Sequence, residues 1–526
     1  MSAYTTEFLH NKLLVKGDFS GIQEFIFNTK SKGAAKTLKG KSFYIQILAE
    51  LAIECIYTNT GITSNKELHT VYNGGGNFYL LIPVDKKEQL IKAEKRIHQD
   101  LKDEGIMLII SSIVYDPLKS YGENLQLLNA CAQEKALNRF DDWEYFFKAK
   151  SIKVNDKADQ VIDKEDFGKE IAEHLLRNEL KYQVRKFGEI FSLDKFPNWQ
   201  NSVNFQVPKW TKDLIEKYKD SIYIQDLAED EKSDFTLYNT ISYNWLGNFA
   251  HERTGTNNLG ILKLDFDGLG GIIREIQTID DSKIFSSLLR GFFEQKLKEL
   301  FENEDINKFA NKGVSYKYKD SISVIFAGGD DAFLVGSWDA IKEFSLLLKK
   351  EFDKYFQNRI NELDFIKKLP TFSAGLIFVT STYPVSSFSN LAEEALANAK
   401  DHTDKNALNI FNHTVDWSQW KKANAQSEKI IDGILYKKVP KSILSRLKQT
   451  HEVYGELVRN RYQLTTLTRF IYDLRSEKID KVFINGLKET YQDYLKNALS
   501  NEGNKTEILI IPIAARLAEF STRKIN

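Results

Sequence analysis

The chain has 526 residues, a length typical of about three or four domains. Its 73 Lys and Arg residues balance its 73 Asp and Glu residues, which excludes a polycationic nucleic-acid coat but leaves a local basic groove open. Two cysteines, Cys55 and Cys131, are too few for a four-thiolate zinc site or a disulfide framework. The N-terminus has no apolar signal core and no apolar run approaches ~20 residues, so we expect a cytoplasmic protein with no membrane partner.

The first predicted unit covers residues 1–115. An apolar strand leads into a glycine turn and a helical stretch in LVKGDFSGIQEFI. A hairpin follows in VYNGGGNFYLLIPV around Gly74, where β-branched and aromatic residues flank the glycines. The next unit, 116–246, carries charged helical patterns such as DFGKEIAEHLLRNELKYQVRKFGEIF and is predicted to be helix-rich.

A second unit of the same form is predicted at 247–416. Its strand and turn lie in ILKLDFDGLGGII, and the helix IFSSLLRGFFEQKLKELFE spaces its apolar residues three and four apart. The hairpin VIFAGGDDAFLVGSW surrounds Gly328, and a helix, a strand (TFSAGLIFVT) and a capped helix (SNLAEEALANAK) complete the unit. The C-terminal segment, 417–526, is again periodic and predicts a helical domain.

The two similar units form a degenerate internal duplication. Aligned without gaps, the two strand-turn segments share Lys, Asp, Phe, Gly and Ile, and a Gly-Gly hairpin follows each at a similar separation. Strand-helix-strand-strand-helix-strand is the ferredoxin-like order, which polymerase palms use. We therefore predict an α+β fold with two ferredoxin-like palm domains and two helix-rich domains.

Clustered carboxylates make the second palm the candidate catalytic unit. Asp265 and Asp267 follow an apolar strand, and Asp330 and Asp331 occupy the tip of a hairpin. If the two strands are neighbours, these acids converge on one edge of the sheet and repel one another unless divalent cations neutralise them. Hard oxygen ligands suit Mg²⁺ or Mn²⁺. Two such ions can activate a ribose hydroxyl and stabilise the charge that develops on a nucleotide's phosphate.

The glycines of the two hairpins point to nucleotide binding. Gly328 and Gly329 have no Cβ, so their backbone can come close to a phosphate. The first palm keeps Asp18, but it has Ser20 and a Gly-Asn pair where the second palm has its other acids. One carboxylate is a poor two-metal site. The glycine turn around Gly74 therefore either binds a nucleotide without much metal or only closes a tight hairpin.

Several motifs in this order resemble the large subunit of type III CRISPR effector complexes: GDFSGIQEFIF, GKSFY, NGGGNFYLLIP, LKLDFDGLG, AGGDDAF and AEEALANAK. The first motif resembles the Csm (type III-A) branch more than the Cmr branch, and the resemblance spans essentially the whole chain. It implies two facing palms that each hold one ATP, similar to the palms of GGDEF diguanylate cyclases. It also implies synthesis of an adenylate second messenger, usually cyclic oligoadenylate, activated by target RNA within a complex of guide RNA and other subunits.

The resemblance assigns the catalytic residues. It makes Asp265 and Asp330 metal ligands, with Asp331 beside them and the carbonyl of Phe266 as a further ligand. These residues would hold two Mg²⁺ or Mn²⁺ ions, and the three acids form the expected catalytic set.

The resemblance also assigns the nucleotide contacts. Lys400 and Lys405 follow the stretch that resembles the cyclase segment whose basic residues hold the triphosphate, although lysine is also favoured at a solvated helix end. Ser42, in GKSFY, falls where the family has a short Arg/Lys-Ser motif near the first palm's nucleotide. The expected nucleotide-binding set comprises Phe266, Asp267, Gly268, Gly328, Gly329, Lys400 and Lys405 in the second palm and Ser20, Gly21, Ser42, Gly74 and Gly75 in the first.

Two features depart from the family pattern. Many members begin with a histidine-aspartate nuclease domain that cuts single-stranded DNA, but here the first palm strand starts near Leu13 and none of the 8 histidines is followed by Asp. Many members also bind zinc between the palms through four cysteines, which two cysteines cannot reproduce. We therefore expect neither DNA nuclease activity nor zinc.

Three functions stay open at this point. The leading hypothesis is a target-RNA-activated nucleotidyltransferase, in which the 3′-hydroxyl of one ATP attacks the α-phosphate of another held at Asp265 and Asp330. There are two alternatives. One is an enzyme that joins ATP to another small molecule, and the other is a non-catalytic scaffold subunit of the RNA-guided complex. A free-standing diguanylate cyclase is disfavoured because such enzymes pair two identical palms, whereas this duplication is asymmetric.

Overall fold

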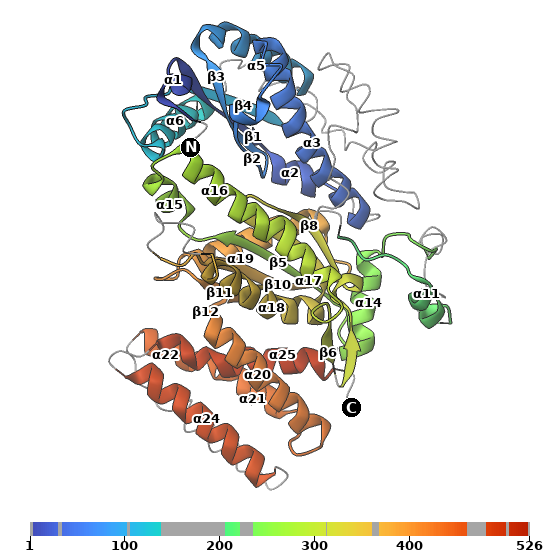
Figure 1. Cartoon of the computed structure of the whole chain (residues 1–526). Helices are drawn as coiled ribbons and strands as arrows, with labels where there is room; N and C mark the ends of the chain where they lie inside the picture. Colours follow the sequence, from blue (N-terminus) through green and yellow to red (C-terminus); the bar gives the residue numbers. More distant parts are fainter. Residues whose placement is uncertain are drawn as a thin grey trace.

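The structure is a computed structural model that describes residues 4–29, 34–101, 106–137, 206–220, 235–311, 313–359, 368–459, 480–500 and 504–523. The predicted helical segments at 166–191 and 460–474 lie outside the described residues. The elements are stacked in three tiers, with the first palm above, the second palm in the middle and the C-terminal helices below (Figure 1).

The first palm is a four-stranded antiparallel sheet in the order β2-β3-β1-β4. This is the ferredoxin-like strand order that the sequence predicts, and the fold class is confirmed. Its elements are α1 (Thr6–Leu9), β1 (Lys12–Ser20), α2 (Ile22–Phe27), α3 (Ala34–Thr60), α4 (Lys66–His69), β2 (Thr70–Gly74), β3 (Asn77–Pro83), η1 (Val84–Lys86), α5 (Lys87–Leu101), β4 (Met107–Val114) and α6 (Tyr121–Leu137).

The second palm is a six-stranded sheet in the order β12-β11-β10-β5-β9-β8. Strands β10, β5, β9 and β8 repeat the order of the first palm, and β11 adds to β10 in parallel. Its elements are α14 (Tyr243–Thr254), β5 (Asn258–Phe266), α15 (Leu269–Glu275), α16 (Ile279–Arg290), the π-helical η6 (Gly291–Lys296), α17 (Leu297–Glu302), β6 (Phe309–Asn311), β7 (Val314–Tyr316), η7 (Tyr318–Asp320), β8 (Ile322–Gly328), β9 (Asp331–Ser337), α18 (Trp338–Gln357), β10 (Phe372–Thr380), η9 (Val385–Ser387), α19 (Phe388–Lys400), β11 (Ala407–Ile410) and β12 (His413–Asp416).

The remaining helices connect and support the palms. Asp416 and Gln419 form a capping box that starts the long helix α20 directly after β12. Helix α14, which contains residue 246, packs on the second sheet, and the predicted domain limits stay predictions. The elements outside the palms are α11 (Lys212–Tyr218), α20 (Trp417–Leu435), α21 (Ile443–Gln449), α22 (His451–Val458), α24 (Lys481–Leu499), η10 (Lys505–Leu509) and α25 (Ile510–Ser521).

The two palms share their hydrophobic cores. One buried cluster joins Leu14 of β1 with Leu264 of β5, and helices α6, α16 and α18 contribute to it. The other cluster joins Phe78 of β3 with Phe27 and Phe333, whose ring centroids lie 4.7 Å apart across the boundary between the palms. Because apolar burial drives folding, each palm depends on the other to cover its sheet.

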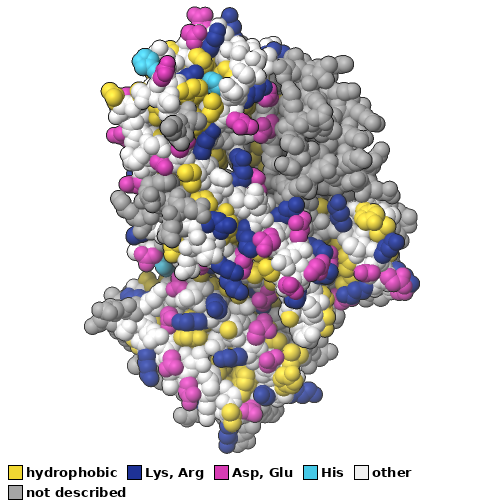
Figure 2. Space-filling model, viewed as in Figure 1, with side chains coloured by type: hydrophobic (Ala, Val, Ile, Leu, Met, Phe, Trp, Pro, Cys, Tyr) yellow, Lys and Arg dark blue, Asp and Glu magenta, His cyan; other side chains and the backbone are white. Residues whose placement is uncertain are grey.

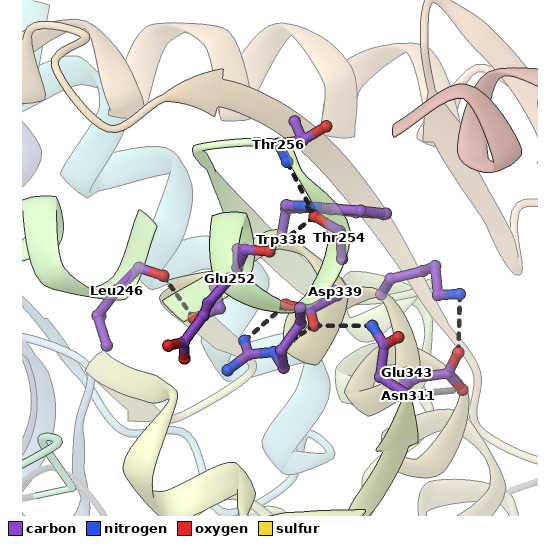
Figure 3. A network of polar contacts seen from close by, with 12 residues as sticks. Leu246, Glu252, Thr254, Thr256, Asn311, Trp338, Asp339 and Glu343 are labelled. Atoms are coloured by element: carbon purple, nitrogen blue, oxygen red, sulfur yellow. Dashed lines mark hydrogen bonds and ion pairs between the residues drawn. The ribbon is translucent and has the colours of Figure 1, made fainter. Parts of the chain in front are cut away.

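A buried polar network fixes α14 to α18 at the end of β9 that lies opposite Asp331 (Figure 3). Arg253 donates from Nε and Nη2 to the two carboxylate oxygens of Asp339 at 2.6 and 2.7 Å, and both side chains are buried. The indole of Trp338 donates to Thr254 Oγ1 at 3.2 Å. Removing one partner of this buried pair would leave an uncompensated charge, so the loss of either Arg253 or Asp339 alone is expected to destabilise the base of the second palm.

The described surface is mixed in charge. Positive and negative side chains are intermingled on the face shown in Figure 2. Among the described helices, none is both long enough and apolar enough to cross a bilayer.

Candidate active site

The two glycine hairpins have the same local geometry and meet at their tips. The register shifts between Thr70 and Tyr72 in β2–β3 and between Val324 and Phe326 in β8–β9, so each hairpin has a bulge at the same distance before its first glycine. A methyl group added to Gly329 would lie 3.9 Å from the Cα atom of Gly75. Elements about 250 residues apart in the sequence therefore form one site.

The structure brings together the three acids predicted to be catalytic. Asp265, at the end of β5, lies opposite Asp331 at the start of β9. Asp330 occupies the turn that joins β8 to β9. The main-chain N–H of Phe266 donates to the carbonyl oxygen of Asp330 at 2.9 Å, which fixes the turn to β5. Strands β5 and β9 are neighbours in the sheet, as convergence of the acids requires.

Burial raises the pKa of all three acids, and repulsion from neighbouring carboxylates adds to this effect. Burial, followed by the charge of Asp265, raises the pKa of Asp330 to about 6. Burial raises the pKa of Asp265, and burial together with both other acids raises that of Asp331 well above its usual value. Such a cluster favours a bound cation. Among the described residues, however, no three acidic, His or Cys side chains already converge as a finished metal site.

Lys400 forms an ion pair with one of the three acids. It is the last residue of α19, and its Nζ donates to Oδ2 of Asp265. The ammonium group therefore neutralises one of the three acids. Contact of Lys400 with a nucleotide phosphate stays a prediction.

Asp267 has a different role from the other acids. It is buried, and its carboxylate accepts hydrogen bonds from Thr371 Oγ1 at 2.9 Å, from Ser373 Oγ at 2.8 Å and from the main-chain N–H of Asn406 at 2.9 Å. These bonds fix the loop after α19, in which Lys405 has a positive φ of 51°. Direct contact of Asp267 or Lys405 with a nucleotide stays a prediction.

The remaining predicted residues of the second palm shape the turn. No atom would lie within 4 Å of a methyl group on Gly328 or Gly268, so both positions face open space. Gly268 and Gly329 have positive φ angles of 70° and 64°, a conformation that favours glycine. The ring of Phe266 packs in the core against α16 and α18, and only its main chain reaches the site.

The first palm offers fewer charges, as predicted. Asp18 forms an ion pair with Lys16 at 3.4 Å, and Gly21, after Ser20, has a positive φ of 86°. Ser42 lies on α3 and is only 3% exposed. The structure therefore does not present Ser42 on an open surface.

Sequence reasoning missed two tyrosines that face the acids from the first palm. Burial, with the charges of Asp18 and Asp330, raises the pKa of Tyr79 to about 12. Burial and Asp330 likewise raise the pKa of Tyr72, whose hydroxyl would lie 3.0 Å from a methyl group on Gly329. The hairpin alignment contains the signal, because these tyrosines correspond to two phenylalanines of β8 and β9 and so add hydroxyls only to the first palm.

The raised pKa of Asp330 predicts how metal-free stability depends on pH. A carboxyl whose folded pKa is about 6 instead of 3.8 stabilises the fold only while it is protonated, so this contribution is lost as the pH rises through about 6. Asp330→Asn removes the titration. Denaturant unfolding in EDTA should therefore show the variant gaining stability over the parent between about pH 4 and about pH 7. A stability difference that does not change with pH would contradict the assignment.

Comparison with known proteins agrees with this geometry. Residues 258–409 match a family model described as Cas10/Cmr2, second palm domain, and residues 11–149 match one described as Csm1 subunit domain B. Crystal structures of a Csm1–Csm4 cassette with cA4 and with one ATP have TM-scores of 0.65 and 0.63 at 17% and 16% identity. Each match covers 97% of this chain and 70% of the other, and at these identities it shows the fold.

Curated relatives match most of the chain. A protein of Methanocaldococcus jannaschii, named CRISPR system single-strand-specific deoxyribonuclease Cas10/Csm1 (subtype III-A), is 26% identical over 494 residues. A protein of the same name from Enterococcus italicus is 24% identical over 457 residues. The matches cover 77% of this chain in both cases, but only 59% and 55% of the relatives' own lengths. The two family models and these relatives together show that the chain is similar to the Cas10/Csm1 large subunits of type III-A CRISPR complexes.

Proposed function

We propose that this chain is a nucleotidyltransferase that uses ATP to make an adenylate second messenger, cyclic oligoadenylate, and that target RNA activates it. The contact between the two hairpin tips carries the proposal, because it opposes three clustered acids of one palm to the acid-poor glycine turn of the other. Related Csm1–Csm4 cassettes have been solved with ATP, pppApA and cA4, which supports ATP as the substrate and a cyclic product.

The reaction follows from this opposition of the palms. The 3′-hydroxyl of an ATP on the first palm attacks the α-phosphate of an ATP on the second, so an O–P bond forms as the bond to pyrophosphate breaks. Asp265, Asp330 and Asp331 fit Mg²⁺ or Mn²⁺, because clustered carboxylate oxygens suit these cations. When bound, the ions neutralise phosphate charge and help to deprotonate the hydroxyl. Lys400 turns from Asp265 to the triphosphate. The open space at Gly328 leaves room for the triphosphate.

The first palm would bind the attacking ATP mainly through neutral groups. The turn from Gly74 to Gly76 offers main-chain amides, which attract phosphate without the repulsion of an acid cluster. Tyr72 and Tyr79 present hydroxyls on the side that faces Asp330, where they can position a ribose. Positioning of the two reactants then supplies much of the rate acceleration.

We further propose that the chain acts with guide RNA, target RNA and other subunits of a type III-A complex, since a related Csm1–Csm4 subcomplex belongs to such a complex.

The second candidate is an enzyme that joins ATP to another small molecule, favoured by the lack of matching acids in the first palm. A scaffold is disfavoured because clustered acids with raised pKa values destabilise a fold that does not use them. That this chain does not cut DNA stays a prediction, and its relatives are named deoxyribonucleases.

We expect two classes of ATP site that differ in their need for metal. The second palm should lose its ATP analogue in EDTA, because a triphosphate that faces three acids is repelled until cations bridge them. The first palm should keep its analogue. Titration with a non-hydrolysable ATP analogue, with and without Mg²⁺, measures both classes, and Gly328→Val, which fills the open space, is the matched variant for the metal-dependent class.

Turnover tests the products directly. The assembled complex with target RNA, ATP and Mg²⁺ should release pyrophosphate and adenylate oligomers that mass spectrometry resolves. Conjugates of adenylate with another molecule would favour the second candidate, and the absence of any new product would favour a scaffold. A single class of ATP site, or two classes that respond equally to EDTA, would contradict the assignment of a metal-poor first palm.

A further inference from the structure

Two basic side chains cross the boundary between the palms in opposite directions. Lys39, near the start of α3 in the first palm, donates from Nζ to the main-chain carbonyl of Val324 and, at 3.3 Å, to that of Ile325 in β8. Arg290, the last residue of α16 in the second palm, donates from Nη2 to the main-chain carbonyl of Asn73 in β2 at 2.6 Å. Each of these two side chains thus contacts the first strand of the other palm's glycine hairpin.

The bulge in β8 explains why Lys39 has acceptors there. The shift in register between Val324 and Phe326 leaves Ile325 out of the β8–β9 ladder. Strand β8 is also at the edge of its sheet, so its outward carbonyls need partners from elsewhere. Lys39 is 1% exposed, and burial holds its pKa well below the usual value. A lysine this deeply buried stabilises the fold only while these hydrogen bonds persist.

Arg290 reaches a hydrogen-bonded chain inside the first palm. Its acceptor, Asn73, donates from Nδ2 to a carboxylate oxygen of Glu50 on α3. Burial raises the pKa of Glu50, and the charge of Arg290 lowers it. Arg290 also lies 3.8 Å from Glu294 on its own side of the boundary. The contact therefore connects α16, the hairpin of the first palm and α3.

We propose that Lys39 and Arg290 are reciprocal positioning residues, which hold the two glycine hairpins in alignment across the boundary. The inference rests on the proposed function, since a hydroxyl on one palm must reach a phosphate on the other. A methyl group added to Gly329 would lie only 3.9 Å from the Cα atom of Gly75, so the hairpin tips lie close together and a small sliding motion of either one would change the distance between the reacting atoms. A misplacement of about 1 Å can cost about 100-fold in rate. Both side chains act through main-chain carbonyls, and neither contacts the clustered acids.

Hydrogen exchange tests the alignment without using activity. In the full chain, Lys39→Met and Arg290→Met should each accelerate amide exchange at least about tenfold in residues 70–77 and also in 322–331, because one hydrogen bond to a charged group is worth that factor. Lys342→Met is the matched control, since it removes a buried lysine that pairs with Glu343 and Glu428 away from the hairpins. It should leave exchange in both hairpins unchanged. Exchange at the wild-type rate, or loosening of only the hairpin that each side chain contacts, would overturn reciprocal alignment.

Kinetics separates positioning from a structural role. In the complex with target RNA, both variants should lower kcat by about 10–100-fold while the KM for ATP and Mg²⁺-dependent binding of the ATP analogue change little. Arg290→Lys, which keeps a donor, should restore most of the rate. A parallel loss of binding and rate, or an equal loss in Lys342→Met, would show that the residues only stabilise the fold. If the parent chain itself makes no product, the proposed function fails, and hydrogen exchange still decides whether the hairpins are held reciprocally.

Discussion

Replacing Asp330 and Asp331 together by Ala is expected to abolish ATP-dependent product formation, with a loss on the order of a thousandfold or more. The two acids are two of the three clustered carboxyls that we propose hold the cations, and burial and repulsion raise the pKa values of both. Pyrophosphate release and the mass of the products, measured in the assembled complex with Mg²⁺, check the expectation.

The same substitution should not harm the fold. Because the folded state raises the pKa of both carboxyls, their ionised forms destabilise the metal-free protein near neutral pH, and removing them should preserve or increase the free energy of unfolding. The isosteric pair Asp330→Asn and Asp331→Asn is the matched control for shape. If either double variant turned over ATP at a nearly normal rate with Mg²⁺ present, the metal site would be elsewhere.

Gly329→Ala is expected to lower product formation by about 100-fold while the chain stays folded. Gly329 has a positive φ of 64°, which costs an L-residue about 1–2 kcal/mol. The added methyl group would also lie 3.0 Å from the hydroxyl oxygen of Tyr72. Relief of this contact must move either the turn that carries Asp330 or the hairpin of the first palm. Single-turnover kinetics with saturating ATP measures the loss.

The chain offers a close control for backbone strain. Gly313, in the β6–β7 turn, has a similar φ of 79°, and no atom would lie within 4 Å of its methyl group. Gly313→Ala should therefore cost similar stability without a loss of activity. Adding Tyr72→Phe to Gly329→Ala should recover part of the rate, because it removes the atom nearest the methyl group. Equal losses from the two glycine variants would mean that strain alone, and not the contact between the palms, limits the rate.

The duplication and the acid cluster could be predicted because both depend on local sequence. The strand-turn segments and the Gly-Gly hairpins keep their order and spacing, and adjacent antiparallel strands bring Asp265 next to Asp331. The fold class and the family resemblance are confirmed on this basis. The domain limits and the nucleotide contacts stay predictions.

Interactions between distant segments could not be predicted in the same way. Lys39 lies in a helix with no sequence signal for its acceptors, since these are exposed only by a bulge in another domain. Asp267 is one of the clustered acids in the sequence, but its hydrogen bonds to Thr371, Ser373 and a loop amide depend on segments that come together only once the sheet has formed. Tyr72 and Tyr79 differ from their counterparts by one hydroxyl each, whose importance appears only when the palms face each other.

The reciprocal contacts between the palms have the character of a two-fold axis. The two glycine turns lie close together, and a helix of each half reaches the hairpin of the other, which resembles the reciprocal contacts of an isologous interface between identical subunits. The shared cores fit this symmetry, because a single palm would leave apolar faces exposed. The interface thus preserves the geometry of a homodimer within one polypeptide. Joining the two copies in one chain freed each to diverge, so that one could keep its acids and the other could lose them without losing its partner.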